Sequence, residues 1–153
     1  MRISVRAIVL KDNKLLVMDR NRFGNKFISL VGGAVEMAES KEYALKREVK
    51  EETTLEIANP RLVIIEDAGE VFGRQYIYLC DYIGGEPRLS EDSIELKITK
   101  DSQNLYSPMW LDINDLEKAN LLPVELKKQL IDFIRNGFPD APIKLTITKD
   151  SKV

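Results

Sequence analysis

The sequence contains no histidine and a single cysteine, and both facts narrow the chemistry open to this protein. Without histidine there is no Ser-His or Cys-His nucleophile pair, no imidazole general base and no histidine-ligated zinc. Cys80 cannot form an internal disulfide, and its apolar, strand-like surroundings predict a small buried hydrophobic side chain rather than a nucleophile. Acid–base or metal chemistry in this chain must therefore use carboxylates.

Long apolar runs and an excess of basic residues are missing as well. No stretch approaches the roughly 20 apolar residues that span a bilayer, and residues 1–5 do not have the layout of a signal peptide. The formal net charge is -2, so there is no overall positive field to hold DNA or RNA, whereas metal ions can help to hold a small phosphorylated ligand. We expect a soluble, cytoplasmic protein without membrane or nucleic-acid partners.

The length and composition suit one domain. The chain has 153 residues, of which 44% are hydrophobic, and we expect a single domain over 1–153, with the course of the tail from about residue 139 left open. Helical spacing after a Ser40 N-cap predicts a helix that ends near Leu55, and a second helix is predicted after Pro123. Runs of β-branched and aromatic residues predict strands over 3–10, 15–18, 27–31, 61–66, 74–82 and 106–111, and an edge strand over 143–147.

Two connections stand out in this pattern. Gly32 and Gly33 are expected to break the third strand, because glycine tolerates backbone angles that other residues avoid. The polar stretch 86–103 is longer than most connections and is interpreted as a functional loop. Strands on both sides of a helix, with a second helix late in the chain, favour a mixed sheet between helical layers, which is an α/β fold.

Three glutamates carry the most informative spacing. Glu48, Glu51 and Glu52 stand at i, i+3 and i+4, so their carboxylates share one helix face and repel one another. A cation would relieve this repulsion, and oxygen ligands favour Mg²⁺ or Mn²⁺ over zinc. The alternative is a solvated acidic face, as expected for Glu42. Arg47 weakens that alternative, because it can pair with Glu51 or reach back toward Glu39.

The segment from Gly33 to Leu55 resembles the Nudix box, which is a glycine, five residues, Glu, seven residues, Arg-Glu, an aliphatic residue, any residue, Glu-Glu, any residue, Gly and an aliphatic residue. The matching positions are Gly33, Glu39, Arg47, Glu48, Val49, Glu51, Glu52 and Leu55. Thr54 departs from the pattern, because the family has glycine there. A β-branched residue in a left-handed conformation costs of order 1 kcal/mol or more, so we expect a different local turn at Thr54.

The resemblance implies an α/β/α sandwich with a mixed β-sheet and a site for divalent cations, Mg²⁺ or Mn²⁺, at Glu48, Glu51 and Glu52. It implies that Arg47 positions these carboxylates and that Glu39 supports Arg47. Gly32 and Gly33 are then expected to let the backbone approach the helix and the substrate. Water attacks a phosphorus of the substrate, with Glu52 or a carboxylate of the polar loop as the base. The loop candidates are Glu91, Asp92 and Glu95.

Two classes of function follow from this resemblance. The first is a metal-dependent pyrophosphohydrolase that acts on a small nucleoside diphosphate derivative, and the second is an inactive nucleotide-binding or regulatory domain. All three presumed metal ligands are present, which favours the enzyme. Substrates of such enzymes include ADP-ribose, dinucleoside polyphosphates and sugar nucleotides, and the lack of ADP-ribose and coenzyme A markers slightly favours nucleoside triphosphates. A homodimer is left open. Some aromatic side chains could stack on a base, although aromatic residues in strands more often belong to the core. They are Phe23, Phe72, Tyr76, Tyr78 and Trp110.

Overall fold

A computed structural model describes residues 1–148 of the chain. Within these residues eight strands form one sheet. The strands are β1 (Ile3–Lys11), β2 (Lys14–Arg22), β3 (Asn25–Ser29), β4 (Val31–Ala34), β5 (Glu56–Asp67), β6 (Arg74–Gly84), β7 (Asn104–Asp112) and β8 (Ile143–Thr146). The helices are α1 (Lys41–Thr53), α2 (Gly69–Phe72), α3 (Ile94–Asp101), the 3₁₀ turn η1 (Ile113–Asp115) and α4 (Val124–Asn136). Helices α1 and α4 have three to four turns, and the other helices are shorter.

The sheet is mixed. Its strand order is β3-β2-β1-β6-β5-β8, while β4 pairs with β1 and β7 pairs with β2. The β1–β6 and β5–β8 pairs are parallel, and the other pairs are antiparallel. The predicted edge strand over 143–147 is confirmed in β8, which ends at Thr146.

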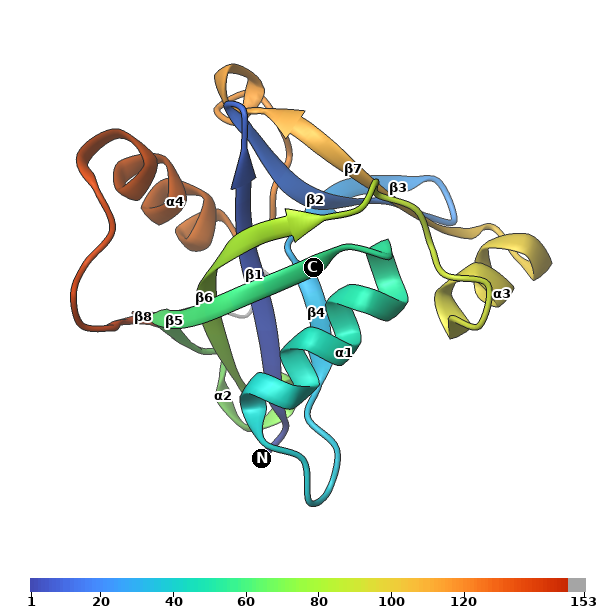
Figure 1. Cartoon of the computed structure of the whole chain (residues 1–153), viewed down its shortest axis with the longest axis horizontal. Coiled ribbons are helices and arrows are strands. Elements are labelled where there is room, and N and C mark those ends of the chain that lie inside the picture. Colours follow the sequence, from blue (N-terminus) through green and yellow to red (C-terminus); the bar gives the residue numbers. More distant parts are fainter. Residues whose placement is uncertain (149–153) are drawn as a thin grey trace.

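Alternation along the strands creates two separate cores. Val5 and Val9 of β1 face a cluster that includes Leu45 and Val49 of α1, whereas Ile8 faces a cluster that includes Leu130 of α4. Helices α1 and α4 therefore cover opposite faces of the sheet (Figure 1), and the predicted α/β/α sandwich with a mixed sheet is confirmed. None of the helices found in residues 1–148 is long and apolar enough to cross a membrane.

The expected strand 27–31 and the glycine break after it are wrong in detail. The chain divides at Leu30 into β3 and β4, and both glycines lie inside β4, paired with β1. A Cβ atom on Gly32 would stand 1.9 Å from the carbonyl oxygen of Val5. The glycine is therefore needed for close approach of two strands rather than for ending one.

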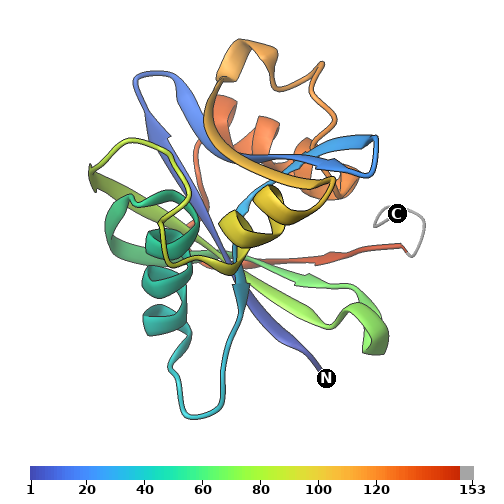
Figure 2. The same ribbon diagram turned by 90° about the vertical axis from the view of Figure 1, so that its right-hand side faces the viewer.

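The polar stretch 86–103 is not a continuous loop. It contains α3, whose N-cap Ser93 accepts a hydrogen bond at Oγ from the backbone N–H of Leu96 (3.1 Å). The sequence held a signal for this helix, since Ser93 precedes Ile94 and Ile98 at i and i+4. Figure 2 shows α3 projecting from the connection between β6 and β7, beside β3 and α1.

Thr54 does not avoid the left-handed conformation, contrary to our expectation. It is the C-cap of α1 with φ 63° and ψ 1°, and its N–H donates to the carbonyl of Lys50 (2.9 Å). Its hydroxyl donates to the carbonyl oxygen of Glu86 (2.9 Å), and the N–H of Arg88 donates to the carbonyl of Thr53 (3.0 Å). These bonds offset a conformational cost of about 1–2 kcal/mol and fasten the chain that leads to α3.

We predict that Thr54→Val lowers the free energy of unfolding by about 1 kcal/mol, because it keeps the left-handed strain and loses the hydroxyl bond to Glu86. Thr54→Gly loses the same bond but also relieves the left-handed backbone strain, so it should be less destabilising than Thr54→Val. The matched control is Thr146→Val at an exposed position of β8. Urea unfolding measures all three variants, and a Thr54→Val variant as stable as this control would contradict the account.

Candidate functional site

Arg47, in the middle of α1, is the centre of a group of carboxylates. Its Nε donates to Glu39 Oε2 (2.6 Å) and its Nη2 to Glu39 Oε1 (2.9 Å), a bidentate pair. Its Nη1 donates to Glu48 (3.0 Å) and to Glu51 (3.4 Å), and Nη2 also reaches the carbonyl of Ala34 (3.3 Å). Both pairings expected from the sequence, with Glu39 and with Glu51, are confirmed.

Glu48 and Glu52 lie on the buried side of α1, where β4 passes close to the helix. A Cβ atom on Gly33 would stand 2.6 Å from the carboxyl carbon of Glu48, so the expected close approach of Gly33 to the helix is confirmed. The backbone N–H of Gly32 donates to Glu52 Oε2 (3.2 Å). Glu51 differs from both, since its side chain is 46% exposed and pairs with Arg47.

Burial and ion pairing shift the acidities of these groups in opposite directions. Burial raises the pKa of Glu52 to about 8, although Arg6 counteracts the shift. Burial also raises the pKa of Glu48, against the effect of Arg47. The hydrogen bonds from Arg47 lower the pKa of Glu39, and the same bonds raise the pKa of Arg47. Glu39 is therefore a fixed anion, while Glu52 can gain or lose a proton near neutral pH.

Glu48 and Glu52 open into a cavity of about 330 Å³ between α1, α3 and the sheet. Of the three predicted loop carboxylates only Glu95 lines this cavity; Glu91 and Asp92 are exposed and do not. Sequence reasoning missed the arginines and the tyrosine that line this cavity together with the glutamates. The lining residues with functional groups are Arg2, Arg6, Arg20, Ser29, Glu48, Glu52, Glu95 and Tyr106, with Gly32 and Gly33 between them.

Arg20 of β2 is held rigidly at this cavity. Its guanidinium lies 3.6 Å from the centroid of the Tyr106 ring and donates from Nε to the carbonyl of Leu105 (3.2 Å), while Nη2 bonds Asn104 Oδ1. Burial lowers its pKa, but arginine stays charged at any physiological pH. For Arg6 the sequence signal was a cation inside an otherwise apolar strand, whereas Arg20 lies among polar residues and carried no such signal.

The donor set of this cavity fits a hard divalent cation chemically. Carboxylate oxygens of Glu48, Glu52 and Glu95 face it, and neither histidine nor cysteine is present. However, the acidic side chains are not gathered around one point, since residues 1–148 contain no cluster of three or more that could hold a metal as it stands. Arg47 instead occupies oxygens of Glu48 and Glu51.

The remaining sequence candidates fall outside this cavity. Cys80 is buried, and burial raises the pKa of its thiol to about 12, which confirms a packing residue rather than a nucleophile. Glu42 is exposed. Tyr78 belongs to the core and Trp110 packs edge-on against Tyr82.

The NUDIX domain model matches residues 1–132 of this chain. The chain therefore belongs to the Nudix hydrolase family, as the spacing from Gly33 to Leu55 predicted. It is a pyrophosphohydrolase that acts on nucleoside diphosphate derivatives. Enzymes of this family generally need divalent metals.

Two curated proteins and several solved structures are similar to it. An ADP-ribose pyrophosphatase of Methanocaldococcus jannaschii is 31% identical over 87% of this chain and 73% of that protein. A NAD-capped RNA hydrolase NudC of Vibrio atlanticus is 27% identical over 81% of this chain but only 42% of that protein. The crystal structure of an ADP-ribose pyrophosphatase from Streptococcus suis superposes with a TM-score of 0.66 at 20% identity, over 95% of this chain and 98% of that one.

We predict that Gly33→Ala leaves the fold intact but lowers turnover on the order of 100-fold, because the atoms nearest to the added methyl group belong to the carboxylate of Glu48, which it displaces. Gly84→Ala is the matched control, since its Cβ would meet no atom within 4 Å. Steady-state kinetics and thermal melting separate the two effects. Equal turnover in both variants would show that the position of Glu48 does not matter.

Proposed function

We propose that Glu48, Glu51 and Glu52 bind the divalent cation, Mg²⁺ or Mn²⁺, and that Arg47 and Glu39 position them. The observation that supports this most is the shared cavity of Glu48 and Glu52, into which Glu95 also faces. The cation, when bound, supplies positive charge to the diphosphate oxygens. The side chain of Glu51 is 46% exposed and pairs with Arg47, and we infer that a change of its rotamer brings its carboxylate into the set.

Glu52 is the proposed general base. A base must reach the attacking water, and Glu52 lines the cavity with its Oε2 held by the backbone N–H of Gly32 (3.2 Å). Water attacks one phosphorus, its proton passes to Glu52, and the bond from that phosphorus to the bridging oxygen breaks. The leaving phosphate carries the electron pair. Arg6 and Arg20, which line the same cavity, stabilise negative charge on the diphosphate. Gly32 and Gly33 leave room for the substrate beside them.

ADP-ribose is the substrate we place first. The name of the relative from Methanocaldococcus jannaschii supports it and outweighs the slight preference for nucleoside triphosphates from the sequence. The reaction is then ADP-ribose plus water to AMP plus ribose 5-phosphate. A small substrate agrees with the net charge of -2, because this charge produces no positive electrostatic field that would attract a long nucleic acid. The cytoplasmic location, the single domain and the homodimer stay predictions.

Glu48→Gln, Glu51→Gln and Glu52→Gln should each lower turnover by at least about a hundredfold, because each removes a metal ligand or the base. Glu42→Gln, at an exposed position of the same helix, is the matched control and should be almost neutral. Kinetics at saturating Mg²⁺ measure the effect. A Glu52→Gln enzyme as active as the control would exclude Glu52 as base and ligand.

A panel of ADP-ribose, nucleoside triphosphates, dinucleoside polyphosphates and sugar nucleotides tests the substrate. We expect ADP-ribose to have the highest kcat/KM, with activity restored by Mg²⁺ or Mn²⁺ after chelation and abolished without them. In oxygen-18 water one label should enter a single product, and no phosphorylated protein should form. Binding without turnover across the whole panel would favour the inactive binding domain instead.

A further inference from the structure

The arginines around the site bond two kinds of acceptor. Arg47 pairs with carboxylates. Arg6 and Arg20 line the cavity into which Glu48 and Glu52 open, the glutamate cavity, and neither forms an ion pair within residues 1–148. The hydrogen-bond acceptors of these two arginines are amide and carbonyl oxygens, which carry no net charge. The protein therefore fixes both guanidinium groups without pairing their charge.

Asn104 of β7 holds one end of the Arg20 guanidinium. Arg20 and Tyr106 are strand partners in β2 and β7, and Asn104 stands two residues before Tyr106, on the same face of the strand. Nη2 of Arg20 donates to Asn104 Oδ1, and Nε donates to the carbonyl oxygen of Leu105 (3.2 Å). A guanidinium cannot accept a hydrogen bond, so the amide must present its oxygen to Arg20. The Tyr106 ring, 3.6 Å from the guanidinium carbon, supports the group from one side.

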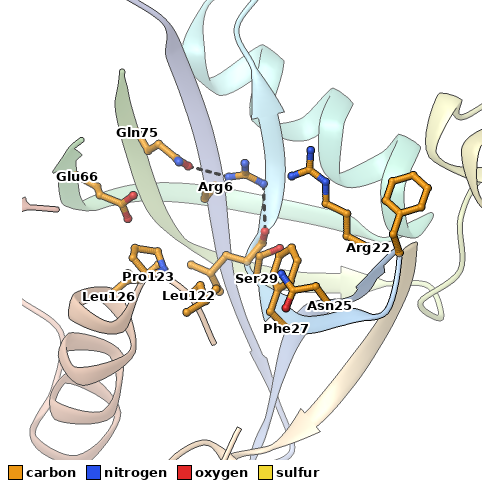
Figure 3. A pocket seen from close by; sticks show the side chains of 12 residues that line it. Arg6, Arg22, Asn25, Phe27, Ser29, Glu66, Gln75, Leu122, Pro123 and Leu126 are labelled. Atoms are coloured by element: carbon orange, nitrogen blue, oxygen red, sulfur yellow. Dashed lines mark hydrogen bonds between the residues drawn. The ribbon is translucent and has the colours of Figure 1, made fainter. Parts of the chain in front are cut away.

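Gln75 of β6 holds Arg6 of β1 in the same way. Gln75 stands two residues before Ile77, the strand partner of Arg6, which is the same offset that separates Asn104 from Tyr106. Arg6 Nε donates to Gln75 Oε1 (2.8 Å), the bond drawn between these two side chains in Figure 3. Two arginines on different strands of the sheet therefore share one arrangement, in which an amide of a neighbouring strand orients the guanidinium.

Neither amide side chain reaches the glutamate cavity itself. Asn104 and Gln75 are absent from the residues that line it, and Gln75 lines only the neighbouring cavity of about 430 Å³, which Arg6 also lines. Any effect of these two amides on a ligand in the glutamate cavity must therefore pass through Arg20 and Arg6.

Each guanidinium keeps N–H groups for a ligand. Within residues 1–148 the Nη1 group of Arg20 and the Nη2 group of Arg6 donate no hydrogen bond. A side chain that is already oriented loses less conformational entropy when an anion binds. A neutral acceptor leaves the positive charge of the arginine to attract that anion, whereas a carboxylate in the same place would compensate it.

We propose that Asn104 and Gln75 are positioning residues, whose neutral amide oxygens orient Arg20 and Arg6 toward the diphosphate of the substrate without compensating their charge. An aliphatic side chain at either position would lose the orientation. A carboxylate would keep the orientation but cancel the charge. This proposal rests on the proposed function for the contact between the arginines and the diphosphate, and that contact is tested separately by Arg20→Ala.

Asn104→Asp separates this role from a purely structural one. The introduced carboxylate bonds Arg20 at least as strongly as the amide does, so the variant should melt at or above the temperature of the wild type. Methylenediphosphonate with Mg²⁺ is a diphosphate probe that cannot be hydrolysed at its bridge, and calorimetric titration measures its binding. Asn104→Asp should weaken this binding at least about tenfold, because a charge-assisted bond to the anion is lost. The matched control is Gln103→Glu, which adds the same charge at the exposed neighbouring position.

Asn104→Leu removes the acceptor without adding charge. It should weaken binding of the probe about several-fold, because Arg20 must then be ordered when the anion binds. In an Arg20→Ala background the same substitution should have no further effect, since Asn104 acts only through Arg20. With ADP-ribose as substrate, both Asn104 variants should raise KM more than they lower kcat, because the diphosphate is charged before the reaction as well as during it.

Gln75→Glu repeats the test through Arg6 and keeps it decisive if a variant of Asn104 does not fold. The proposal is overturned if folded Asn104→Asp and Gln75→Glu variants bind the probe as tightly as Gln103→Glu does, or if Asn104→Leu still weakens binding in the Arg20→Ala background. An Arg20→Ala variant that binds the probe like the wild type would instead overturn the contact of Arg20 with the diphosphate in the proposed function. The titrations do not depend on turnover, so the two failures are distinguishable.

Discussion

The guanidinium of Arg47 holds together parts of the chain that would otherwise repel or separate. It bonds the carboxylates of Glu39, Glu48 and Glu51 and the backbone carbonyl of Ala34. Without a cation among them, acidic side chains one turn apart destabilise their helix. Since these partners come from β4, from the connection after it and from α1, the same group also sets where the helix lies against the sheet.

Close approach of β4 makes this arrangement specific. Glycine is required at position 32, where a side chain would meet the Val5 carbonyl, and at position 33 it leaves room for the Glu48 carboxylate. The same closeness buries Glu52 and raises its pKa. The same packing therefore places Glu52 at the wall of the cavity and desolvates its carboxyl group.

Charges of both signs meet at the site although the whole chain is close to neutral. Glutamates of α1 and α3 line the glutamate cavity together with Arg6 and Arg20 of the sheet. Such an arrangement attracts an anion together with a cation, which is the composition of a metal-bound diphosphate. Arg6 also lines the neighbouring cavity, where the amide of Gln75 bonds it without pairing its charge.

The sequence by itself determined the elements whose signals are local. Period and capping predicted α1 with its Ser40 cap, and the i, i+4 spacing predicted the pairing of Arg47 with Glu51, because residues four apart on a helix share a face. Tertiary structure alone decided which distant groups meet: Arg6 and Arg20 in one cavity with Glu52, Glu95 rather than Glu91, and the pairing of Asn104 with Arg20. It also decided the backbone conformation of Thr54. The left-handed strain there is offset by a hydrogen bond to Glu86, a partner that local propensity cannot reveal.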